Sequence, residues 1–100
     1  NTFKNYVSSG VGTSEATVYT VPSSTTAVLI GCNIANVTSS QIKVTVKVAN
    51  THVVKTVPVP ANSALSVLDG KIIAETTDTV KVTSDTASSV DVIVSVLEQT

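Results

Sequence analysis

The residues of this 100-residue chain that could perform acid–base or nucleophilic chemistry are few. His52 is the only histidine, so it is the only candidate for the general base that a hydrolytic triad needs. Serines are numerous, but none lies in a Gly-x-Ser-x-Gly elbow. His52 follows Asn50-Thr51 at the start of an expected strand, where an exposed turn residue is the simpler interpretation. The sequence therefore predicts a protein that is not an enzyme and has no catalytic residues.

The sequence also contains few residues that could ligate a metal or hold a cofactor. A zinc site needs about four Cys, His or acidic ligands, and Cys32 and His52 do not supply them. Four acids lie near expected loops and could converge as calcium ligands at one end of a sandwich: Asp69, Asp78, Asp85 and Asp91. No dedicated calcium loop accompanies them, and ordinary turn acids are the favoured interpretation. The four glycines form no phosphate-binding turn, so we expect no metal and no cofactor.

Two further residues have both a chemical and a structural interpretation. Cys32 could be a reactive thiol, but it ends the apolar run 27–32 and cannot close a disulfide within the chain, so we expect a small buried hydrophobe. Asn36-Val37-Thr38 matches the glycosylation acceptor pattern. Such triplets arise by chance when Ser and Thr exceed a quarter of the residues, and we treat this one as coincidence.

Composition and charge exclude several classes of protein. The net charge is −1, the sequence pI is about 5.6 and arginine is absent, which argues against a nucleic-acid-binding protein. The apolar run 27–32 is far too short to cross a bilayer. The first residues, 1–4, lack the charged-then-apolar order of a signal peptide, so we expect a soluble protein made in the cytoplasm, with no membrane partner.

Alternating apolar residues predict strands that position these side chains. In 41–49 the residues Ile42, Val44, Val46 and Val48 share one face, as a half-buried strand requires. Near the C-terminus the residues Val90, Val92, Val94 and Val96 do the same, but Ile93 and Leu97 make the opposite face apolar as well. We expect the C-terminal strand to be covered on both sides, by the core and by something else. Val44, Val46, Val92 and Val94 should be buried.

Further short strands are expected at 3–8, 15–21, 26–35, 52–57, 64–68, 71–74 and 79–83, with turn residues between them. Asp69-Gly70 predicts a tight hairpin that pairs 65–68 with 71–74. Pro58 and Pro60 place 57–61 at a sheet edge or in a crossover, because proline cannot donate to a ladder. The predicted fold is an all-β antiparallel sandwich of about eight short strands, either jelly-roll or immunoglobulin-like.

The chain divides into a single β-sandwich domain over 13–100 and a shorter segment over 1–12. That segment carries Phe3 and Tyr6, followed by Gly10 and Gly12 as a flexible joint. It has two interpretations, an N-terminal arm that anchors the domain elsewhere or a plain first strand at a sheet edge.

Four stretches of turn and strand residues resemble one family of proteins. They are 17–22 (TVYTVP), 34–40 (IANVTSS), 59–65 (VPANSAL) and 81–85 (KVTSD). The chain resembles the small β-sandwich virion proteins of tailed bacteriophages, especially phages of marine bacteria and cyanobacteria. The resemblance covers nearly the whole chain but involves no chemical motif, so it transfers no catalytic or binding residue. It implies a capsid decoration or cement protein, or a neck or tail accessory subunit.

The leading hypothesis is therefore a non-enzymatic virion structural protein that forms a homo-oligomer and docks on major capsid, neck or tail proteins. The alternative is a carbohydrate- or receptor-binding module that contacts a host surface glycan, since sandwiches often present such sites on their end loops. Sugar sites usually need exposed aromatic side chains, and Tyr6 and Tyr19 are the candidates for that role.

Overall fold

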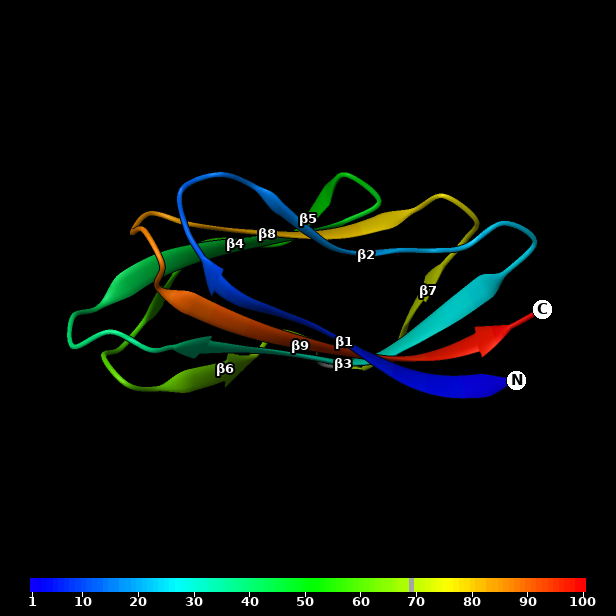
Figure 1. Ribbon diagram of the computed structural model, residues 1–100, viewed down its shortest axis with the longest axis horizontal. Coiled ribbons are helices and arrows are strands. Elements are labelled where there is room, and N and C mark those ends of the chain that lie inside the picture. Colours follow the sequence, from blue (N-terminus) through cyan, green and yellow to red (C-terminus); the bar gives the residue numbers. More distant parts are fainter. Residues whose placement is uncertain (69) are drawn as a thin grey trace.

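The computed structural model describes residues 1–68 and 70–100, which form nine strands in two packed antiparallel sheets (Figure 1). The strands are β1 (Thr2–Val11), β2 (Ala16–Thr20), β3 (Thr26–Asn36), β4 (Ile42–Val48), β5 (Thr51–Val59), β6 (Ala64–Ser66), β7 (Ile72–Ala74), β8 (Thr79–Ser84) and β9 (Val90–Gln99). The predicted all-β sandwich is confirmed. No helix in the described part of the chain is long and apolar enough to span a membrane.

The strand order identifies the topology. Sheet A has the order β1-β9-β3-β6, with β7 also paired to β3, and sheet B has the order β2-β8-β4-β5. Strands from the two ends of the chain pair in nested fashion, β1 with β9, β2 with β8 and β4 with β5. This ribbon is rolled so that β9 also pairs with β3 and β8 with β4. The sandwich is a jelly roll, the first of the two topologies that the sequence left open.

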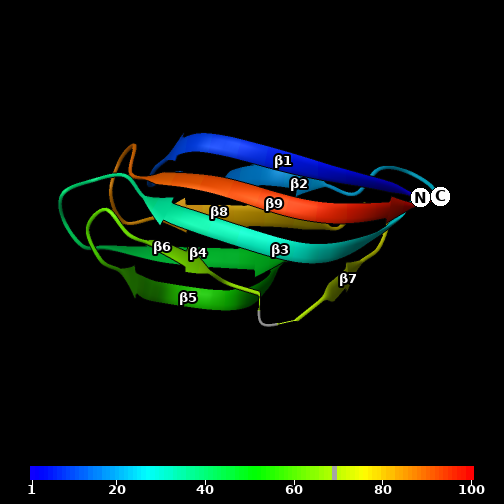
Figure 2. The same cartoon turned by 90° about the horizontal axis from the view of Figure 1, so that it is seen from below.

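β1 forms an edge of sheet A and pairs with β9 from Thr2 to Val11. It fills most of the segment 1–12, for which the sequence allowed an arm or an edge strand. Figure 2 shows it lying beside β9 along the length of the sheet. Deleting the segment would remove one strand of the sandwich, so single substitutions of its outward-facing residues are the better probe of what it contacts.

The expected hairpin around Asp69-Gly70 is wrong. Asp69 lies outside the described residues, but the strands on both sides of it pair with β3. β6 binds β3 at Asn33–Ala35, and β7 binds the same strand at Ala27–Leu29. β6 and β7 therefore follow one another along the free edge of the long β3, as Figure 2 shows. With 11 residues, β3 is long enough for both short strands to pair with it one after the other.

The core lies between the sheets and consists largely of valine. Val44, Val46, Val92 and Val94 are all buried there, as the alternation predicted. β5, which contains Pro58, is the edge strand of sheet B, so the predicted position of that proline is also correct.

The valine core gives a direct stability prediction. Val94→Ala removes two buried methyl groups from the centre of β9, so we expect the free energy of unfolding to fall by about 1 to 3 kcal/mol. Denaturant unfolding of the variant and the wild type measures the change. A change near zero would mean that the core closes around the missing methyl groups.

Candidate interaction surface

The outer face of sheet A carries most of the exposed apolar side chains of the chain. Strand register aligns Phe3 with Leu97, Leu97 with Val28, and Val28 with Ile73, so one apolar row crosses β1, β9, β3 and β7. Phe3 is 73% exposed, and Ile73 is exposed at the other end of the row. Neighbours in such rows are close enough for their side chains to touch.

A second apolar pair lies farther along the same face. Val7, which is 67% exposed, pairs with Ile93 on β9. Ile93 belongs to the apolar outer phase of the C-terminal strand, which the sequence predicted to be covered. Its inner neighbours Val92 and Val94 are covered by the core, whereas Ile93 itself stays exposed. Nothing within the described residues covers this face, so the prediction for the outer side of β9 is not met by the chain alone.

A shallow hollow of about 240 Å³ lies between these apolar groups. It is lined by Phe3, Lys4, Asn5, Ile30, Ser95 and Val96. Gly31 pairs with Ser95 across β3 and β9, and a Cβ at Gly31 would meet only the Ser95 Cβ, at 3.9 Å. Because Gly31 has no side chain, the surface is recessed at the middle of the face. The Ser95 hydroxyl donates a hydrogen bond of 2.8 Å to Asn5 Oδ1, which satisfies this polar group.

The outer face of sheet B is chemically different. Alternation on β4 and β8 points Lys43, Lys47 and Lys81 away from the core, with threonines between them. Glu15 bridges two of these lysines, at 3.2 Å from Lys47 Nζ and 3.9 Å from Lys81 Nζ. The solvent-exposed face of this sheet is therefore charged and rich in hydroxyl groups. The two outer faces therefore differ in polarity, and the face of sheet A is the one suited to contact with another protein.

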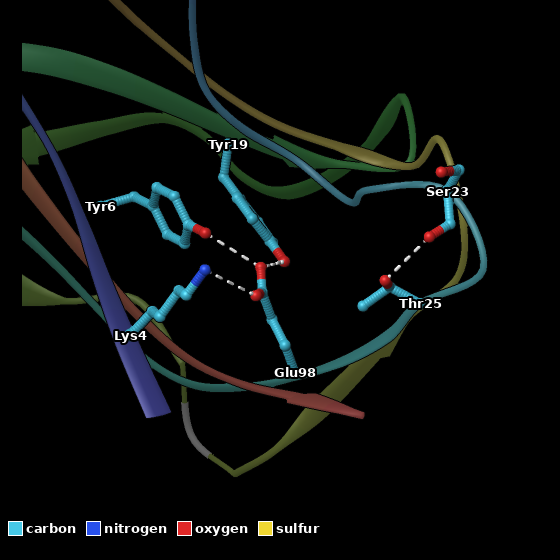
Figure 3. Close-up of polar contacts among 6 residues, drawn as sticks. All are labelled: Lys4, Tyr6, Tyr19, Ser23, Thr25 and Glu98. Carbon is cyan, nitrogen blue, oxygen red and sulfur yellow. Dashed lines mark hydrogen bonds and ion pairs between the residues drawn. The ribbon is translucent and has the colours of Figure 1, made fainter. Parts of the chain in front are cut away.

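A polar cluster around Glu98 holds β1 and β2 against β9 (Figure 3). Glu98 continues the inward phase of Val90 to Val96 and is only 7% exposed. Its Oε2 accepts hydrogen bonds from the Tyr19 hydroxyl at 2.6 Å and the Tyr6 hydroxyl at 2.9 Å. Lys4 Nζ lies 3.3 Å from Oε1. The rings of Tyr6 and Tyr19 stack, with their centroids 4.4 Å apart.

The electrostatics of this cluster favour a fixed ion over proton transfer. The Tyr19 hydrogen bond is the main reason why the pKa of the Glu98 carboxyl lies below its usual value, and the bonds from Tyr6 and Lys4 act in the same direction. Burial, and then the bond to Glu98, raises the pKa of both tyrosine hydroxyls. At neutral pH the carboxylate is a weak base and the phenols are weak acids. The cluster is suited to joining the two sheets.

The sequence did not identify this cluster. The signal that could have found it is the two-residue period of β9, which puts an acid in the inward phase directly after four valines. An inward carboxylate needs donors, and the two tyrosines of the chain carry hydroxyls on side chains long enough to reach it from neighbouring strands.

The structure separates the residues that the sequence considered for chemistry. His52 is exposed and pairs with Lys47 on the outer edge of sheet B. Cys32 is buried, and its burial raises the pKa of the thiol to about 11, so it is the inert hydrophobe that was expected. Gly10 has a positive φ of 66° directly before the end of β1.

The acids considered as calcium ligands do not converge. Asp78 and Asp85 flank opposite ends of β8. Asp78 accepts a hydrogen bond from the Glu75 backbone, Asp85 from Lys43, and Asp91 from Gly10, as turn and edge acids do. Asp69 lies outside the described residues. Within the described chain no three His, Cys, Asp or Glu residues gather as a metal site would require.

Asn36, the residue of the glycosylation triplet, is a structural hub. Its side chain is buried, and Nδ2 donates to the backbone carbonyls of Ser40, Val59 and Pro60 at 2.8 to 3.1 Å. Its Oδ1 accepts from the backbone and hydroxyl groups of Thr38. An amide nitrogen held in this way is unavailable to a sugar in the folded protein, so coincidence remains the interpretation of the triplet.

Comparison of the chain with models of protein families, with curated proteins and with solved structures finds no match in any of the three.

Proposed function

We propose that the chain is a non-enzymatic virion structural protein of a tailed bacteriophage, either a capsid decoration or cement protein or a neck or tail accessory subunit. The observation that carries the proposal is the largely apolar outer face of sheet A, built around Phe3, Val7 and Ile93. Exposed apolar patches of this kind mark surfaces that are covered in an assembly. The type of assembly comes from the sequence resemblance.

The jelly-roll topology is compatible with this function. Jelly rolls occur in viral capsid domains, but they also occur in lectins, so the fold by itself does not choose between a structural and a sugar-binding role. The positions of the aromatic residues favour the structural role. Tyr19 is buried and Tyr6 is half-buried in the Glu98 cluster, which leaves Phe3 as the one mainly exposed aromatic side chain. A stacking platform for a sugar would need more than this.

Incorporation into particles tests the proposal. Particles banded in a density gradient from the source culture should contain the chain in many copies, measured by quantitative mass spectrometry, and immunogold labelling should place it on the head, neck or tail. When variants replace the wild-type chain, Val7→Lys should lose incorporation because it puts a charge on the apolar face. The matched control Thr20→Lys adds the same charge to an exposed position on β2 of sheet B and should incorporate normally. Recovery of the wild-type chain only among free proteins would refute a virion role.

A further inference from the structure

We propose that the outer face of sheet A binds the same face of a second copy of this chain, so that two sandwiches pack sheet A against sheet A around a two-fold axis. The inference rests on the proposed function in one respect, namely that this face is an assembly surface. It adds the identity of the partner, a second copy of the chain. Three properties of the face point to a second copy: its charge, its size and its shape.

The charge of the face suits self-association. Among the outward-facing residues of β1, β3, β7 and β9, the charged side chain is Asp91, at the start of β9. Its Oδ1 already accepts a hydrogen bond from the Gly10 backbone at 3.0 Å. Lys4 also lines the hollow, but its Nζ is paired with Glu98 Oε1 at 3.3 Å. A two-fold interface places the same patch of both copies in contact, so a charged group on the patch comes close to a group of the same charge on the other copy. This face has almost no charge to repel a copy, and almost none with which to select a charged partner.

The size of the face is sufficient. The molecule measures 41 × 20 × 20 Å, so the outline of its broad face is at most about 800 Å², which equals the area that each partner contributes to a standard stable interface when the whole face is used. Two sheets packed face to face are an established arrangement, with about 10 Å between them. The same arrangement already joins sheets A and B within the chain.

The shape of the face places a projection beside a hollow. Phe3 projects from β1 and forms one wall of the hollow, which Lys4, Asn5, Ile30, Ser95 and Val96 complete. In a two-fold dimer, if residue i of one copy contacts residue j of the other, then j also contacts i. An axis that passes near the hollow would therefore insert the Phe3 ring of each copy into the hollow of the other. The Ser95 hydroxyl on its floor is already hydrogen-bonded to Asn5, so covering it leaves no hydroxyl unpaired.

Sedimentation velocity of the purified chain tests the inference, at concentrations up to about 1 mM so that weak association is detected. The wild type should form a discrete dimer. Val7→Lys should weaken the dimer roughly a hundredfold or more, since an unpaired ammonium would be buried at the interface. Phe3→Ser should also weaken it by removing the projection. Both positions are mainly exposed in the single chain, so both variants should fold, which circular dichroism checks. Thr20→Lys is the matched control and should dimerise as the wild type does.

A wild-type monomer at every concentration, a larger closed ring, or a dimer insensitive to both variants would overturn the inference. The particle experiment tests the proposed function separately from the dimer. If the chain is monomeric and Val7→Lys still loses incorporation, the face binds another virion protein and the proposed function stands. If the chain dimerises through this face but is absent from particles, the inference stands and the virion role fails.

Discussion

Asn36→Ala should lower the free energy of unfolding by roughly 2 to 4 kcal/mol, because the buried Asn36 side chain makes several hydrogen bonds at once. Its amide joins the end of β3 to the loop at Ser40 and to the crossover that begins at Val59. Alanine removes the amide donor from the Val59 carbonyl, whose hydrogen bond is buried. The Ser40 and Pro60 carbonyls still accept from Thr38 Oγ1 and the Ser63 backbone. Denaturant unfolding at a fixed protein concentration measures the loss.

Two companion variants show which bonds are responsible. Asn36→Asp keeps an oxygen that can accept from Thr38 but removes the donor, so it should cost at least as much as alanine if the carbonyl contacts dominate. Asn33→Ala changes an exposed asparagine on the same strand and should alter stability by less than about 0.5 kcal/mol. If Asn36→Ala were as mild as Asn33→Ala, water would be replacing the amide and the hub would not hold the crossover.

Sequence reasoning succeeded where one physical pattern dominates. The alternation in β4 and β9 gave the buried faces of both strands correctly, because these strands lie in the middle of the sheets and have one side fixed by the core. Pro58 gave a correct edge position because a missing N–H constrains a strand directly. Such signals are local, and they remain valid whatever the rest of the chain does.

The errors concern partners that are distant in sequence. The Asp69-Gly70 signal describes a turn, but whether its flanking strands pair depends on β3, about 30 residues earlier for β6 and about 45 for β7. The role of Asn36 depends on carbonyls 23 and 24 residues away. The assembly face depends on register, which aligns Phe3 with Leu97 from the opposite end of the chain. Periodicity gives the phase of each strand but does not give the strand order.

The Glu98 cluster should make the stability of the sandwich dependent on pH in the acid range. The folded-state pKa of Glu98 lies below its usual value of 4.5, so the carboxylate stabilises the folded state above that value. This contribution is lost as the pH falls below the usual value and through the folded-state pKa, because the protonated acid is a poorer acceptor for Tyr19 and Tyr6. Glu98→Gln has no proton to gain and should lack this component.

At pH 7 we therefore expect the free energy of unfolding of Glu98→Gln to be about 1 to 2 kcal/mol below that of the wild type, since a neutral amide replaces a charged acceptor for the buried Tyr19 hydroxyl and the half-buried Tyr6 hydroxyl. Lys4 is half exposed, so its ion pair adds little. The gap between the two proteins should shrink as the pH falls below the usual pKa of 4.5 and through the lower folded-state pKa of Glu98. The carboxyl of Asp85 also has a lowered pKa, mainly because of its bond from the Lys43 backbone, but it is common to both proteins and cancels in the difference.

The matched control is Glu15→Gln, which removes an exposed carboxylate from ion pairs with Lys47 and Lys81 and should cost less than about 0.5 kcal/mol at pH 7. A gap for Glu98→Gln that stayed constant with pH would show that the tyrosines need only an oxygen acceptor. A gap that closes in acid would show that the charge itself joins the sheets at this end of the sandwich. It would also tie β1, which carries Phe3 and Val7, to the protonation state of one residue on β9.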